Sequence, residues 1–374
     1  MAAARLAGAG VKTILLDEKL AWEKPCGGGV TCKAYKEYPF LIDNDTPKKL
    51  VTDSCLSEPS AGIARLQMEQ PLVIYARKDL NGMMLERAAR AGANIEKARV
   101  IQADRTASGG WRIETKRGHI DADYCIAALG ARNPLRNVGA EWRAGDTMTA
   151  LGYFVDSHRD HVDIRFLPGL EGYIWVFPRL GHLSVGICGK GETAQAMRLR
   201  LEAYMDEEGI NYRDARFYGH MLPSLEQSSW QSHRVAGDGW LAVGDSAGLV
   251  DPVTGEGIYY AVRSGDVAAQ TILEKGPEHA ESSYRKQLYH EFIEDLTYGA
   301  HLSKRLFCES IFGSTMTVRM IQLMRRSPLL TKVVEDLFAG SQNYLTLKKR
   351  LVETAADLFP DFVLGAFFPR KTAS

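Results

Sequence analysis

The chain has 374 residues, and at roughly 150 residues per domain this length predicts two or three domains or one large composite fold. Hydrophobic residues make up 45% and charged residues 25%, which excludes intrinsic disorder and fibrous repeats as the main character of the chain. The 46 basic residues equal the 46 acidic ones, so the basic excess typical of nucleic-acid binding is missing and we expect no nucleic-acid partner.

Six cysteines are spread along the chain without a CxxC pair or a Cys/His spacing typical of zinc sites. We expect reduced thiols in a cytoplasmic protein and no metal centre, with the polar turn around His158, Asp160 and His161 being ordinary surface. No apolar run reaches roughly 18 residues, so no transmembrane helix is expected.

Helices and strands alternate along most of the chain, which predicts an α/β doubly wound core. Two strand-rich stretches, 48–76 and 149–231, predict a mostly antiparallel layer inserted into it. In chain order we expect a helix at 1–9, a strand at 11–17, a glycine-rich loop at 21–36, strands at 48–56 and 62–76, a helix at 79–92, short strands at 94–104, 110–116 and 119–128, strands within 149–190, a helix at 194–209, a strand at 239–244, a helix at 257–274 and mostly helix from 277 onward.

The N-terminal segment has the pattern of the second half of a dinucleotide-binding unit. Residues 1–9 have the spacing of the helix that follows a GxGxxG turn, and Asp17 ends the next strand, where the acid that holds a ribose belongs. The strand and the glycine turn of such a unit would precede Met1. We therefore expect the chain to lack them and to bind its dinucleotide weakly.

Residues 239–265 contain a longer and more specific pattern. An apolar strand ends in Gly244–Asp245, and Gly255-Glu256-Gly257 opens a helix, with Ile258 as a further candidate cofactor contact. The glycines allow the backbone to approach a ring system, and the N-terminus of the helix favours an anion. This pattern resembles the second FAD motif of the flavoprotein hydroxylase superfamily, in which Asp245 would accept a ribityl hydroxyl group.

Two further positions fit the same resemblance. Arg77 follows a strand and precedes a helix, as does the arginine that contacts FAD in that superfamily. Residues 129–130 are Leu-Gly where the superfamily has Asp-Gly, so the acid is absent while Gly130 and Arg136 fit.

The segments KPCGGG (24–29) and GYIWVFPR (172–179) resemble the geranylgeranyl reductase family, with Arg179 where that family has a lysine. Cys26 resembles the cysteine that the family places near the flavin and is our candidate catalytic residue; an inert thiol is the alternative. In a strand, alternate residues point to one face, so three aromatic side chains form a stripe that either walls a substrate cavity or packs into the core: Tyr173, Trp175 and Phe177.

The resemblance implies a doubly wound, Rossmann-like FAD-binding domain, an inserted β domain for the substrate and a helical C-terminal region. We assign 1–47, 77–148 and 232–275 to the first, 48–76 and 149–231 to the second, and 276–374 to the third. The implied reaction is reduction of carbon–carbon double bonds in a prenyl lipid. The reductant, NAD(P)H or reduced ferredoxin, is left undecided, and Cys26, Tyr173 or water is the proton donor.

Other functions remain open. The aromatic strand also resembles the WxWxIP strand of flavin-dependent halogenases, so a halogenase or monooxygenase of the same fold is the alternative. Residues 244–248 match GxSxG, the nucleophile elbow of hydrolases, although that elbow needs a helix starting at Ser246. The apolar residues within 367–371 suggest peripheral contact with a membrane.

Overall fold

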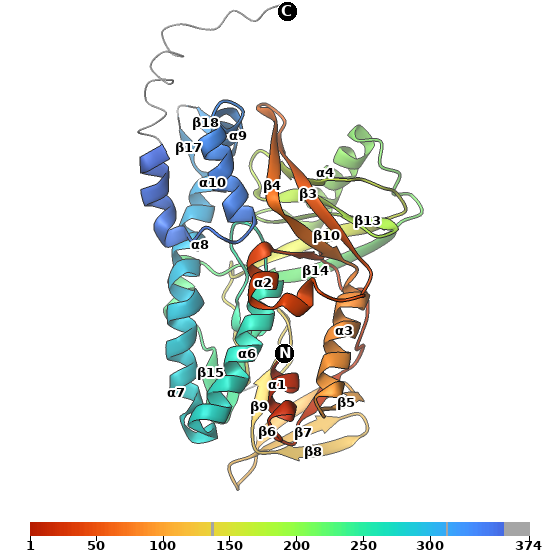
Figure 1. Ribbon diagram of the computed structural model, residues 1–374, viewed down its shortest axis with the longest axis vertical. Coiled ribbons are helices and arrows are strands. Elements are labelled where there is room, and N and C mark those ends of the chain that lie inside the picture. The colour runs from red at the N-terminus through yellow and green to blue at the C-terminus, as the bar shows by residue number, and fades with distance from the viewer. Residues whose placement is uncertain (136–137, 312, 355–374) are drawn as a thin grey trace, which may run out of the picture.

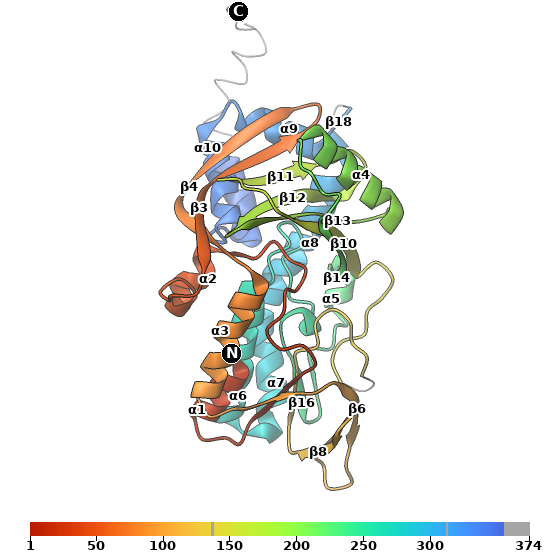
Figure 2. The ribbon, with the colours of Figure 1, turned by 90° about the vertical axis from the view of Figure 1, so that its right-hand side faces the viewer.

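The computed structural model describes residues 1–135, 138–311 and 313–354. Arg136 and the segment 367–371 lie outside these ranges. Parallel strands and their helices form one end of the molecule, and a large curled sheet forms the other (Figures 1 and 2). The helices α7 (Pro277–Leu288) and α8 (Glu294–Cys308) follow one another along one side, so the C-terminal region contacts both ends.

The parallel strands belong to two separate small sheets. In the first, β1 (Ile14–Asp17) pairs with β5 (Asn94–Lys97). In the second, β9 (Cys125–Ala127) pairs with β16 (Trp240–Ala242), to which β15 (Ala236–Gly237) adds an antiparallel edge. The helices α1 (Ala2–Gly8), α3 (Arg77–Arg90) and α6 (Ile258–Lys275) accompany these strands. The predicted α/β core is thus present, with no strand joining β1 to β9 among the described residues.

A third small sheet corrects one expected element. The segment predicted as one strand at 94–104 is two strands, because β5 ends at Lys97 and the chain turns into a separate antiparallel sheet. That sheet lies at the far end of the molecule from the large sheet (Figure 2) and consists of β6 (Val100–Arg105), β7 (Trp111–Thr115) and β8 (Gly118–Ala122).

The large sheet has the order β14-β10-β13-β12-β11-β3-β4-β2, and β11–β3 is its parallel pair. One face packs against α8, α9 (Met316–Met324) and α10 (Pro328–Phe338). The other face packs against α4 (Ala194–Glu207). The predicted antiparallel layer is therefore confirmed, and its strands are β2 (Gly29–Val30), β3 (Lys48–Glu58), β4 (Gly62–Tyr75), β10 (Thr147–Val155), β11 (Val162–Phe166), β12 (Glu171–Arg179), β13 (His182–Lys190) and β14 (Arg216–Pro223).

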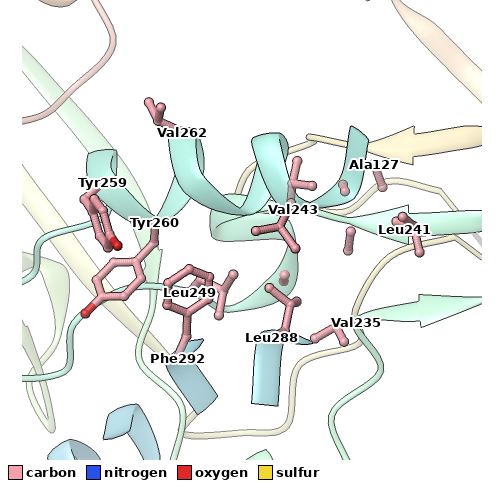
Figure 3. Close-up of a cluster of buried hydrophobic side chains, with 14 of the residues drawn as sticks. Ala127, Val235, Leu241, Val243, Leu249, Tyr259, Tyr260, Val262, Leu288 and Phe292 are labelled. Atoms are coloured by element: carbon pink, nitrogen blue, oxygen red, sulfur yellow. The ribbon is translucent and has the colours of Figure 1, made fainter. Parts of the chain in front are cut away.

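The core at the parallel end forms between β16, α6 and the helices that follow. Figure 3 draws Leu241 on one side of this cluster, Tyr260 and Phe292 on the other, and Val243 and Leu288 between them; all five are buried. Burial of these side chains fixes the start of α6 against the end of β16, which positions the loop between them.

Short elements complete the described chain. The loop predicted at 21–36 ends early, because α2 begins at Cys32. A small β17–β18 hairpin interrupts the predicted helical region. None of the described helices is long and apolar enough to cross a membrane. The remaining elements are α2 (Cys32–Glu37), α5 (Gln227–Trp230), the 3-10 turns Pro39–Leu41 and Gly244–Ala247, the π-helical turn Tyr289–Ile293, β17 (Ser310–Ile311), β18 (Ser314–Thr315) and a helix over 344–354.

Candidate active site

A cavity of about 1520 Å³ runs from the parallel strands to the large sheet. A pocket for one drug-sized ligand has roughly 300–1,000 Å³, so this cavity has room for more than one such molecule. Side chains from segments more than 200 residues apart in the sequence meet at its wall. All twelve candidate site residues line it, namely Asp17, Cys26, Arg77, Gly130, Tyr173, Trp175, Phe177, Gly244, Asp245, Gly255, Gly257 and Ile258.

Asp245 lies directly after β16 and faces Lys24 of the glycine-rich loop. Lys24 Nζ is 3.1 Å from Asp245 Oδ2. Burial raises the pKa of a carboxyl group, but Lys24, with Arg77 and His220 nearby, outweighs it, and the pKa of Asp245 is below its usual value. An ionised, partly buried acceptor therefore faces the cavity. The turn before it requires glycine, since Gly244 has φ +54° and an added Cβ would lie 2.9 Å from Ala261 Cβ.

Arg77 opens α3 and is held in place by Glu23. The Arg77 backbone N–H donates to Glu23 Oε1 at 2.9 Å, and its Nη2 donates to Asn81 Oδ1 at 3.3 Å. Its Nε is buried and has no hydrogen-bond partner among the described residues. A buried polar atom without a partner costs free energy, so this nitrogen is available to a ligand in the cavity.

His220, on β14, is a second such group that the sequence did not single out. Its Nε2 is also buried without a partner in the described chain, and the side chain lines the cavity. Burial, with Lys24 adding repulsion, lowers the pKa of His220 to about 4, so the imidazole is neutral. The only sequence signal was its position two residues after Tyr218 on the same strand face.

The glycine-rich loop is anchored by Arg179, which is 2% exposed. Its guanidinium pairs with Glu23 and donates to the backbone oxygens of Cys26 and Gly27. Gly28, with φ +86°, lies so close to β4 that an added Cβ would be 2.1 Å from the Tyr75 carbonyl oxygen. Arg179 thus replaces the expected lysine with a group that holds two carbonyls and a carboxylate at once.

Cys26 lies in this loop between two arginines. Its Sγ accepts a hydrogen bond from the Gly28 N–H at 3.3 Å. Burial raises the pKa of the thiol, but Arg77 and Arg179 outweigh it, and the pKa of Cys26 is lower than that of an ordinary cysteine. This environment agrees better with a reactive thiol than with an inert one; its catalytic role stays a prediction.

The aromatic stripe lies along the cavity wall. Tyr173 Oη donates to the Thr254 carbonyl oxygen, which joins β12 to the loop before α6. Trp175 lies over Gly186 and also belongs to the core between the sheet and the C-terminal helices. Phe177 packs on the glycine-rich loop, within about 3 Å of the Cβ positions of Gly27 and Gly29. The substrate and core interpretations of the stripe therefore overlap at Trp175, and contact with substrate stays a prediction.

The N-terminus of α6 points at the same cavity. Gly257 is the N-cap, and both Gly257 and Ile258 line the cavity. A helix N-terminus carries partial positive charge and favours an anionic group. Glu256 caps the first turn, since its Oε1 accepts from the Tyr259 N–H at 2.7 Å. Burial raises the pKa of Glu256 to about 7, a feature that the sequence alone did not indicate.

Asp17 and Gly130 occupy the part of the cavity near the parallel strands. Asp17 Oδ1 accepts hydrogen bonds from the N–H groups of Lys19 and Leu20 at 2.6 and 2.5 Å, so this oxygen stabilises the turn after β1. Gly130, with φ +79°, accepts a hydrogen bond from Ser246 Oγ at 3.3 Å. Their contacts with a cofactor remain predictions.

The geometry at Ser246 does not match a nucleophile elbow. Its side chain is 2% exposed and bonds to Gly130, and a 3-10 turn follows β16 in place of a helix. The nearby His233 Nε2 contacts the Ala247 carbonyl oxygen at 3.1 Å. Ser246 is therefore not placed as an activated nucleophile.

One metal-like cluster occurs among the described residues, away from the cavity. It consists of Cys55, His161 and Asp163, so the turn predicted as plain surface contributes His161. Arg159 pairs with Asp163 and would repel a cation. We therefore assign no metal to this cluster.

Comparison with known proteins gives relatives in sequence and in fold. No model of a protein family matches the chain. It is 26% identical over 306 residues to chloroplastic geranylgeranyl diphosphate reductase of Arabidopsis thaliana, a match that covers 73% of this chain and 63% of that enzyme, less than two thirds of its length. It is 29% identical over 302 residues to digeranylgeranylglycerophospholipid reductase 2 of Methanothermobacter thermautotrophicus, covering 72% of this chain and 74% of that protein.

Solved structures share the fold. A geranylgeranyl bacteriochlorophyll reductase-like protein from Thermoplasma acidophilum has a TM-score of 0.77 and 22% identity, covering 94% of this chain and 95% of that one. A flavin-dependent brominase has a TM-score of 0.66 and 13% identity, covering 95% and 96%. The relatives named here are reductases, and the solved structures share the fold of flavin-dependent enzymes, so the chain is similar in sequence to geranylgeranyl reductases and has the fold of these flavin enzymes.

Proposed function

We propose that this protein reduces carbon–carbon double bonds of a prenyl lipid chain with the help of FAD. The observation that carries the proposal is that one cavity joins a polar compartment to an apolar one. The polar compartment contains Asp245, Arg77, His220 and the N-terminus of α6. The apolar compartment lies between the large sheet and the C-terminal helices and is lined by Ala150, Ile164, Phe166, Leu222, Leu306, Met320, Val334 and Phe338.

The polar compartment fits a flavin. Arg77 Nε and His220 Nε2 lack partners, Asp245 offers an ionised acceptor, and the α6 N-terminus favours negative charge. Bound FAD would supply the hydride for the reduction. The positive end of α6 would stabilise the negative charge of its reduced form, as electrostatic preorganisation requires.

The apolar compartment fits a long hydrocarbon chain. Its aliphatic and aromatic walls exclude water and hold a flexible chain in one orientation, which lowers the entropic cost of bringing a double bond to the cofactor. Tyr173 bonds to the loop before α6 and Phe177 packs on the glycine-rich loop, so we place the strand that carries them and Trp175 between the two compartments. We assign to them the alignment of the double bond.

The electron donor is NAD(P)H or reduced ferredoxin. We also propose that the lipid enters from a membrane surface near α10 and the helix over 344–354. Leu329, Leu345 and Val352 are exposed there, and Lys348 and Lys349 add positive charge.

The test is to purify the flavin-loaded protein, reduce it anaerobically with dithionite and add geranylgeranyl diphosphate. The expected product is heavier by two hydrogens for each double bond reduced. Failure to saturate the chain, together with oxygen-dependent hydroxylation or halogenation of an aromatic compound, would favour the monooxygenase or halogenase alternative, whose fold this chain shares.

A further inference from the structure

Glu256 is an acidic residue that lines the cavity just before α6 begins. It lies between Gly255 and Gly257, which line the cavity with it. Oε1 accepts the Tyr259 N–H at 2.7 Å, which fixes the side chain at the start of α6. The Ile258 N–H also lies beside the carboxyl group, and no ion pair among the described residues involves it.

The loop that carries Glu256 is tied to the aromatic strand. Tyr173 Oη donates to the carbonyl oxygen of Thr254, two residues before Glu256. The Asp251 carboxylate holds the same loop, since Oδ1 accepts the N–H groups of Val253 and Thr254 at 2.9 and 2.8 Å. The position of the acid relative to the stripe is therefore fixed by several hydrogen bonds.

The burial of Glu256 favours its protonated form. Burial is the main cause that raises its pKa to about 7, and the neighbouring Asp251 carboxylate adds to it. The N–H groups of Tyr259 and Ile258 and the charge of Lys33, on α2, oppose this rise. Among the remaining groups on this side of the cavity are Asp295 on α8 and three phenols that stay neutral, namely Tyr173, Tyr260 and Tyr344.

The other candidate donors are less suited to give up a proton at neutral pH. Burial raises the pKa of Tyr173 well above its ordinary value, so its phenol is a very weak acid. Burial raises the pKa of Cys26, but Arg77 and Arg179 outweigh it and lower the pKa, which favours the thiolate over the form that carries a proton. A carboxyl group that titrates near neutrality matches the requirement for a general acid.

Resting on the function proposed above, we propose that Glu256 is the proton donor of the reduction. Bound FAD in its reduced form would supply a hydride, and thus two electrons, to one carbon of the double bond. The Glu256 carboxyl group gives its proton to the partner carbon, so that the alkene gains two hydrogens, and solvent returns a proton to the carboxylate.

The test compares Glu256→Gln with wild type in single turnovers of the dithionite-reduced holoenzyme on geranylgeranyl diphosphate. The amide keeps the acceptor for the Tyr259 N–H but cannot donate an acidic proton, so we expect full flavin content and a loss of saturation of roughly 10²–10⁴-fold. The matched control is Glu274→Gln, which lies exposed on the same helix and should saturate like wild type.

Two further readouts separate the role of an acid from a structural one. The wild-type rate should fall as pH rises through about 7, and this decline should disappear in Glu256→Gln and return in Glu256→Asp. Infrared spectra should show a carboxylic C=O band that titrates in wild type and is absent from Glu256→Gln.

Two results would overturn the assignment. The first is a Glu256→Gln variant that saturates the chain at the wild-type rate. The second is a wild-type spectrum without the titrating band. If wild type itself saturates no prenyl chain, the proposed function fails, and the infrared titration, which needs no turnover, distinguishes this case from a failure of the Glu256 assignment alone.

Discussion

Arg179 offers the sharpest test of how the glycine-rich loop is held. In Arg179→Met the side chain keeps its length but loses its charge, which leaves the partly buried Glu23 carboxylate and the carbonyls of Cys26 and Gly27 without their donor. Removing one partner of a buried ion pair costs about 3–5 kcal/mol, because the other charge stays buried and unpaired. We expect a decrease of this size in the free energy of unfolding.

Urea denaturation of the holoenzyme measures this change, with Arg112→Met as the control. Arg112 forms an ion pair with Asp121 at the surface, so its loss should change stability little. The double variant Glu23→Gln/Arg179→Met leaves no charge unpaired. Its decrease in the free energy of unfolding should therefore be smaller than the sum of the decreases in Glu23→Gln and in Arg179→Met. The described anchoring is wrong if Arg179→Met unfolds at the same urea concentration as Arg112→Met. It is also wrong if the decreases in stability of the two single variants add up to that of the double variant.

Three other predictions concern the cavity wall. Asp245→Ala should weaken retention of FAD, because an ionised acceptor for the ribityl chain is lost and Lys24 is left unpaired. Flavin absorbance after dialysis measures the retained FAD, and full flavin occupancy would contradict the assignment. Trp175→Ala should abolish saturation of prenyl chains while the flavin spectrum is kept; loss of folding would instead support a core role. Burial lowers the pKa of His220 to about 4, below its value near 6.5 in the unfolded chain, so the native state should lose stability as pH falls from about 6.5 to 4. Denaturation curves of His220→Gln should lack that part of the pH dependence, and an unchanged pH dependence would contradict the prediction.

Local patterns predicted much of the fold and of the candidate site. The period-2 stripe of Tyr173, Trp175 and Phe177 placed three side chains on one face of a strand, and all three line the cavity. Gly244 and Asp245 were found because a strand, a turn and a helix follow each other within one segment. These features depend on neighbours in the sequence, which a single sequence shows directly.

Features that depend on distant segments were missed. Nothing in the sequence indicates that Lys24 meets Asp245, 221 positions away, or that Arg179 reaches Glu23 and Cys26. The altered pKa of Glu256 was likewise hidden, because it results from burial and from charged groups such as Lys33, which is more than 200 positions away. The helix α2 was missed because the glycines before Cys32 suggested that the loop continues.

The glycine-rich loop links the chemistry of the two compartments. Lys24 binds Asp245 beside the parallel strands, while Phe177 and Arg179 of the large sheet hold Gly27 to Gly29. The position of a ring bound near Asp245 relative to a chain bound along the aromatic stripe therefore depends on these few contacts. Because an error of about 1 Å in alignment reduces rate far more than affinity, changes in this loop should lower turnover before they lower the binding of either ligand.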